Sequence, residues 1–97
     1  MQFVIIARDD PAPGTLDRRM AARPEHLEGL RRLYAEGKIL DGGALLDDRE
    51  RMCGSVMLCE FESRAALDAY LETEPYFRDK VWKDVEIRAM RRAPLKA

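Results

Sequence analysis

Arg19-Met-Ala-Ala-Arg-Pro-Glu-His-Leu-Glu-Gly-Leu-Arg-Arg-Leu-Tyr34 is the stretch around which this chain is organised. At about 100° per residue, its apolar side chains fall on one arc of a helical wheel, which predicts an amphipathic helix packed on a core. Arg19, Arg23 and the only histidine, His26, fall inside the same arc. Such side chains are costly to bury without a partner, so they are the first candidates for a functional site. The apolar members of the arc are Leu16, Met20, Leu27, Leu30, Leu33 and Tyr34.

Pro24 decides whether Arg19, Arg23 and His26 belong to one helix. Proline lacks an N–H and is most comfortable in the first turn of a helix. A helix that begins at Pro24 keeps His26 in phase but releases Arg19 and Arg23. A helix that begins earlier and runs through Pro24 keeps all three, and we favour it because the apolar arc continues before the proline.

The composition fits a single soluble domain over residues 1–97. With 17 basic and 18 acidic residues the net charge is −1, so neither nucleic acid nor an anionic membrane is an expected partner. No apolar run has the length of a membrane span or signal-peptide core, and a cytoplasmic location is expected.

The two cysteines, Cys53 and Cys59, lie on one predicted strand, about 20 Å apart and too far for a disulfide. We expect both to be small buried hydrophobes in a reducing compartment. One histidine and no close cysteine pair give no support to a metal site, and no cofactor is expected.

Periodicity and chain breakers place the other elements. Strands are expected at 1–8, 38–46, 52–61 and 84–91, and helices from 15 or 17 to near Gly37 and at 64–73. Thr15 or Asp17 is expected to cap the first helix and Ser63 the second. Gly42-Gly43 predicts a bulge or a close approach to the backbone. Residues 47–51 form a charged hairpin connection, and 74–77 break the second helix.

This β-α-β-β-α-β order predicts the ferredoxin-like, α+β fold, in which two helices cover one face of a four-stranded antiparallel sheet. The strand over 52–61 has apolar residues on both of its faces. One face carries Cys53, Ser55, Met57, Cys59 and Phe61, and the other carries Val56 and Leu58. Because two helices cover only one face, the second is expected to meet another copy of the chain in a homodimer.

Short motifs follow one another along nearly the whole chain. They are Ala7-Arg8-Asp9; Arg19 followed by Arg23-Pro24-x-His26-Leu27; 36–40 with Gly43; Gly54-Ser55-Val56; 60–63; Pro75-Tyr76; and Val85-x-Ile87. In this order and spacing they resemble the YciI (YCII-related) family of dimeric α/β-barrel proteins. The resemblance implies a ferredoxin-like fold dimerised through the sheets, and a site built on the histidine of the first helix and the acidic residue of an Asp-Pro-aromatic motif.

In this chain those two positions are His26 and Glu74, so Asp-Pro has become Glu-Pro. Ala44 stands where the family usually has a proline after the glycine of the second strand. Glutamate keeps the charge but carries its carboxylate about one methylene further from the backbone. A few relatives act on chlorinated or lactone intermediates of aromatic breakdown, as dehydrochlorinase- or isomerase-like enzymes. The resemblance therefore implies acid–base chemistry.

His26 and Glu74 are the predicted catalytic pair. A carboxylate that accepts from one ring nitrogen fixes the tautomer and leaves the other nitrogen as a general acid or base near neutral pH. The alternative is a histidine bonded to backbone, without chemistry. Arg19 and Arg23 are predicted to bind the carboxylate of a substrate. Their alternative is a structural salt bridge to a neighbour such as Asp9.

Three further residues complete the predicted binding site. Ser55 is expected to donate a hydrogen bond inside the cleft, and Gly43 marks a place where a ligand can approach the backbone. Tyr76, with Phe77, is expected to wall the pocket, although aromatic residues after a helix often serve as core or dimer contacts. Trp82 is expected to be packing alone.

These features predict a cofactor-free acid–base enzyme, a lyase or isomerase of dehydrochlorinase type, that acts on a small anionic metabolite. The alternatives are a non-catalytic small-ligand binding module and a purely structural dimerisation domain. An enzyme requires His26 at a pocket and bonded to Glu74; a binding module requires the pocket alone, and a structural domain requires neither.

Overall fold

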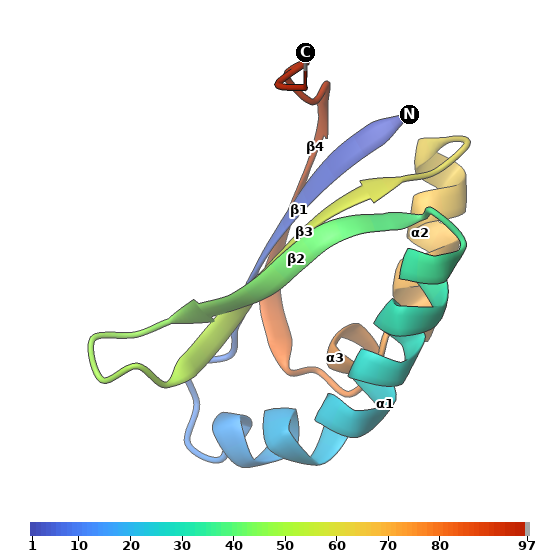
Figure 1. Cartoon of the computed structure of the whole chain (residues 1–97). Helices are drawn as coiled ribbons and strands as arrows, with labels where there is room; N and C mark the ends of the chain where they lie inside the picture. The colour runs from blue at the N-terminus through green and yellow to red at the C-terminus, as the bar shows by residue number, and fades with distance from the viewer. Residues whose placement is uncertain (97) are drawn as a thin grey trace.

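The computed structural model describes residues 1–96 and has the predicted ferredoxin-like order with one additional short helix (Figure 1). The strands are β1 (Gln2–Asp9), β2 (Ile39–Leu46), β3 (Met52–Glu60) and β4 (Trp82–Met90). The helices are α1 (Thr15–Ala35), α2 (Arg64–Thr73) and α3 (Pro75–Arg78), of which α3 was not predicted.

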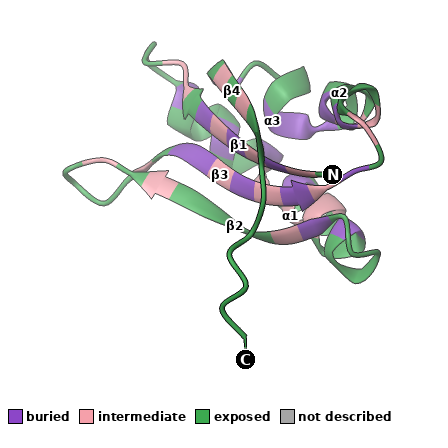
Figure 2. Cartoon of the chain, turned by 90° about the horizontal axis from the view of Figure 1, so that it is seen from above, coloured by how far each residue is buried: buried purple, intermediate pink, exposed green. Residues whose placement is uncertain are grey.

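The four strands form one antiparallel sheet in the order β2-β3-β1-β4. All three helices lie on the same side of this sheet (Figure 1). On that side Phe3, Ile5 and Ala7 of β1 are at most 3% exposed, and they meet Met57 and Cys59 of β3 in the core. Buried residues therefore gather on the two central strands and the helix faces turned toward them (Figure 2).

Helix α1 runs without interruption through Pro24, which confirms the favoured alternative. Its buried stripe is Thr15, Arg19, Ala22, His26 and Leu33. The predicted arc was centred on the wrong side of the helix: Leu16, Met20 and Tyr34, which belong to it, are 37%, 48% and 66% exposed. The apolar side chains do not set the rotation of the helix; the buried partners of Arg19 and His26 do.

The N-terminus of α1 differs from the prediction, whereas its C-terminus agrees with it. Neither Thr15 nor Asp17 caps the helix; the N-cap is Gly14, whose φ of +89° suits glycine, and no side chain bonds there. At the other end the chain turns at Gly37, with φ +76°, as a left-handed glycine after a helix does. In α2, Ser63 caps as predicted, because its hydroxyl accepts from the Ala66 N–H at 3.1 Å.

The two cysteines have different environments. Cys59 is fully buried, and its thiol donates to the Phe3 carbonyl at 3.4 Å. Cys53 is exposed, contrary to the prediction. The pairing of β2 with β3 shifts register between Leu45 and Leu46, and such an irregularity re-aims the side chains beside it.

Candidate active site

A histidine–carboxylate pair joins α1 to the segment between α2 and α3. The His26 Nδ1 lies 2.5 Å from the Glu74 Oε1, and the two side chains are 7% and 2% exposed. The other ring nitrogen, Nε2, has no hydrogen-bond partner within residues 1–96. When Nδ1–H donates to the carboxylate, Nε2 is left to accept a proton.

Glu74 reaches His26 because it belongs to two helix ends at once. It is the C-cap of α2 and the N-cap of α3, with extended backbone angles of −67° and 123°. Pro75 follows at the first position of α3, where its missing N–H costs nothing. The Glu74 Oε1 also accepts from the Tyr76 N–H at 3.2 Å, so α3 turns the carboxylate toward α1.

The Tyr76 ring lies against both His26 and Arg19 of α1. Its ring stacks on the His26 ring with centroids 3.9 Å apart, and the Arg19 guanidinium lies 4.5 Å from its centroid. Burial raises the pKa of the Tyr76 phenol, although the charges of Arg19 and Arg23 oppose this. The phenol oxygen makes no hydrogen bond within residues 1–96, so it remains a neutral donor for a ligand.

Arg19 is held in a buried polar row that also fixes Ser55. Its Nη1 donates to both oxygens of Asp9 at 2.8 and 3.0 Å, and its Nη2 donates to the Ser55 hydroxyl at 2.9 Å. Trp82 Nε1–H donates to the same hydroxyl oxygen at 3.2 Å. Both acceptor sites of Ser55 are therefore used, and its O–H is free to donate.

Burial controls the electrostatics of this row. It raises the pKa of the Asp9 carboxyl, while the charge and hydrogen bond of Arg19 pull the same pKa down. The Arg19 Nε–H is buried without a partner. The Ser55 O–H and the Arg19 Nε–H are thus donors without a partner within residues 1–96.

These side chains meet at one cavity of about 240 Å³ between α1 and the sheet. Of the predicted site residues it brings together all but Glu74, which lies behind His26. Arg23 also lines it and has no ion pair within residues 1–96, unlike Arg19. Gly43 leaves open space, whereas at Gly42 an added Cβ would come within 2.9 Å of the Val56 carbonyl oxygen. The lining residues are Arg19, Arg23, His26, Leu27, Leu30, Gly42, Gly43, Ala44, Met52, Ser55, Met57 and Tyr76.

Sequence reasoning missed two residues of the site. Trp82 was expected to be packing alone, yet its N–H orients Ser55. Tyr70 was not among the predicted site residues, yet its hydroxyl donates to the Glu74 Oε2 at 2.8 Å. A tyrosine one helical turn before a buried glutamate is the only local signal for this contact.

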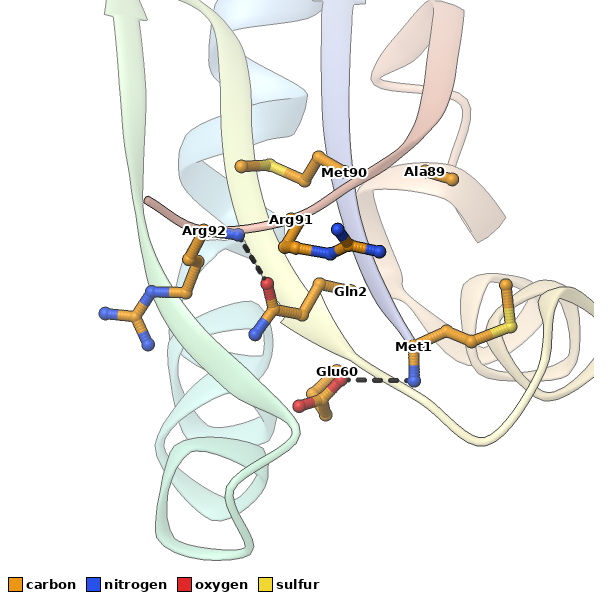
Figure 3. Close-up of a pocket in the computed structure, with 7 residues that line it drawn as sticks. All are labelled: Met1, Gln2, Glu60, Ala89, Met90, Arg91 and Arg92. Atoms are coloured by element: carbon orange, nitrogen blue, oxygen red, sulfur yellow. Dashed lines mark hydrogen bonds and ion pairs between the residues drawn. The ribbon is translucent and has the colours of Figure 1, made fainter. Parts of the chain in front are cut away.

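A wider hollow of about 570 Å³ lies at the ends of β1 and β4 and contains none of the predicted site residues (Figure 3). Its polar contacts join exposed groups: the Met1 amino group to Glu60 at 3.1 Å, and the Arg92 N–H to Gln2 at 2.7 Å. Among the described residues no cluster of three metal-binding side chains occurs. None of the described helices is long and apolar enough to cross a membrane.

Comparison with known proteins places this chain in a family. Residues 1–91 match the model of the YCII-related domain. The chain belongs to this family. Curated relatives include a Haemophilus influenzae protein, 32% identical over 95% of this chain and 98% of its own length. The Escherichia coli protein YciI is 31% identical with the same coverage.

Solved structures confirm the ferredoxin-like fold of this YCII-related protein. The 5-chloro-2-hydroxyhydroquinone dehydrochlorinase of Burkholderia phenoliruptrix superposes with a TM-score of 0.82 at 28% identity, covering 96% of both chains. That structure is a complex with 2,5-dihydroxybenzoquinone. An antibiotic biosynthesis monooxygenase, 24% identical with a TM-score of 0.58 over 97% of this chain and 100% of its own, shares the fold.

Proposed function

We propose that this protein is a cofactor-free acid–base enzyme, a lyase or isomerase of dehydrochlorinase type, acting on a small anionic molecule. One observation carries the proposal: His26 lines a cavity of about 240 Å³ and bonds to Glu74 through Nδ1, while its Nε2 has no partner within residues 1–96. Likeness to a dehydrochlorinase at 28% identity over nearly the full length supports the same class of reaction.

In the proposed reaction, His26 Nε2 takes a proton from the substrate while Glu74 stabilises the imidazolium that forms. For an elimination, the leaving group departs with the electron pair of its bond, and the new double bond takes the electrons of the broken bond to hydrogen. For an isomerisation, His26 returns the proton to another atom. Neither course needs an external oxidant.

The binding groups around His26 fit a substrate rich in acceptor oxygens. Within residues 1–96, Ser55 O–H, Arg19 Nε–H and Tyr76 O–H are donors without partners, and Arg23 supplies positive charge that no carboxylate balances. The charge of Arg19 is balanced by Asp9, so we assign the ionic contact to Arg23 and a hydrogen bond to Arg19. Open space at Gly43 leaves room for a ring at the rim.

The test measures chloride release from 5-chloro-2-hydroxyhydroquinone and, separately, calorimetric binding of 2,5-dihydroxybenzoquinone. We expect turnover by the wild type, a loss of about 10²–10⁴-fold in His26→Gln, and binding retained in that variant. Glu72→Gln, at an exposed glutamate on α2, is the control and should leave turnover unchanged.

The other two predicted functions are separate outcomes of this experiment. Binding of the quinone without turnover in the wild type would favour a ligand-binding module. Absence of both binding and turnover would contradict this substrate class.

We also propose that two copies pair through the sheet face opposite the helices. On that face Val4 lies opposite Leu58, and Ile6 opposite Val56; all four are half-buried in the single chain. No helix covers them (Figure 1). A second sheet packed there would bury this apolar strip, as in aligned sheet packing.

A further inference from the structure

We propose that Tyr70 is a positioning residue for the His26–Glu74 pair: it holds the second oxygen of Glu74 and thereby fixes the tautomer of the histidine. The inference rests on the proposed function, because it concerns the protonation geometry of the same pair. It gives a role to a hydroxyl that lies outside the substrate cavity.

The two oxygens of Glu74 have separate tasks. Oε1 accepts from His26 Nδ1 at 2.5 Å and from the Tyr76 N–H at 3.2 Å, whereas among the described residues Oε2 accepts only from the Tyr70 hydroxyl, at 2.8 Å. Glutamate has three rotatable side-chain bonds, so a carboxylate held at one oxygen alone can still pivot. Contacts at both oxygens fix its plane.

Tyr70 is itself rigid and keeps its proton. It lies four residues before Glu74 on α2, and its ring stacks on Phe61 with centroids 5.5 Å apart and planes 21° apart. Burial, followed by the charge of Glu74, raises the pKa of the Tyr70 phenol far above its ordinary value. The hydroxyl is therefore a constant donor to Oε2.

The side of Glu74 away from the substrate cavity faces a second space. A groove of about 240 Å³ between α1 and α2 is lined by Tyr70 and Glu74, among others, but not by His26. The substrate cavity is lined by His26 but not by Glu74. Without the hydroxyl, groove water replaces a fixed donor at Oε2, and the carboxylate is free to turn from His26.

The tautomer of His26 reports this movement directly. While Oε1 faces Nδ1, the neutral ring carries its proton on Nδ1 and presents bare Nε2 to the cavity. When the carboxylate turns away, the tautomer protonated at Nε2 becomes populated, and that form has no base at the substrate. If the Tyr70 hydroxyl were purely structural, its removal would change the stability of the protein but not the tautomer of His26.

The experiment records the ring-nitrogen chemical shifts of His26 in the ¹⁵N-labelled full chain, at a pH where imidazole is neutral. With one histidine the assignment is unambiguous. We expect a single Nδ1–H tautomer in the wild type and a mixture in Tyr70→Phe, which keeps the stack on Phe61. Tyr34→Phe, at a tyrosine 66% exposed, is the matched control and should resemble the wild type. Glu74→Ala gives the signal of a ring without its carboxylate.

A wild-type tautomer that persists in Tyr70→Phe overturns the role of Tyr70 and leaves the pair intact. A mixture already present in the wild type overturns the pair, and with it both proposals. A mixture in Tyr34→Phe as well would show an unspecific effect and reject the inference. If Tyr70→Phe does not fold, Tyr70→Leu removes the hydroxyl with a different side chain, and a single Nδ1–H tautomer in that variant would contradict the inference.

Discussion

At the scale of single residues, most hydrogen-bond acceptors of the site are already occupied by donors of the protein. Ser55 accepts two hydrogen bonds, from Arg19 and Trp82, so only its proton remains for a ligand. Glu74 accepts three, from His26, Tyr70 and the Tyr76 N–H. The extra methylene of glutamate does not prevent the bond to His26, because the chain turns at Pro75 and brings the carboxylate back toward α1.

The two cysteines give a prediction at this scale. Burial raises the pKa of the Cys59 thiol from 9.0 to about 11, whereas Cys53 is exposed. Above about pH 9 the unfolded thiol ionises while the folded one keeps its proton, so the free energy of unfolding falls as pH rises toward 11. Urea denaturation across this range measures the slope, and Cys59→Ala should flatten it. An identical slope in that variant would assign the effect to other groups.

At the scale of elements, short connections carry much of the site. Helix α3 has only four residues, yet it supplies Tyr76 and the N–H that orients Glu74. It is tied to α1 on the surface by Arg78, which donates to both Glu25 oxygens at 2.8 and 2.9 Å. Both partners are exposed, so this pair adds little stability and serves mainly to locate the helix.

Replacing either of two glycines by alanine tests where α1 ends. Neither Gly29, inside the helix, nor Gly37, just beyond it, has any atom within 4 Å of an added Cβ. We expect Gly29→Ala to stabilise by about 1 kcal/mol through helix propensity. Gly37 has φ +76°, so Gly37→Ala should destabilise by about 1–2 kcal/mol. Denaturation midpoints of the two variants measure both, and changes of the same sign would contradict the assignment of the helix end.

At the scale of the whole molecule, the sheet has helices on one side only (Figure 1). The exposed side carries the strip of Val4, Ile6, Val56 and Leu58 that we assign to a second copy. Sedimentation analysis should therefore give a dimer, and Val56→Lys should shift it toward monomer at equal concentration, because a charge would be buried in an apolar interface. Thr73→Lys, at an exposed position on the helical side, is the control. A monomeric wild type would reject the interface.

The sequence by itself predicted the order of the four strands and the two longer helices and the antiparallel sheet, and it favoured the passage of α1 through Pro24. These follow from local periodicity and from turn residues, which act within a few positions of the chain. It also put Arg19, Arg23 and His26 on one helix face and Ser55 in the expected cleft, and the resemblance to the YCII-related family pointed to Glu74.

Only the tertiary structure decided which of these groups are partners. Apolar periodicity centred α1 on an arc that leaves Leu16, Met20 and Tyr34 exposed, whereas the buried face carries Arg19 against Asp9 and His26 against Glu74. Trp82 meets Ser55 across 27 positions, and Glu74 meets His26 across 48. Hydrogen bonds over such separations leave no periodic trace in a sequence, so only the folded chain shows which donor each acceptor receives.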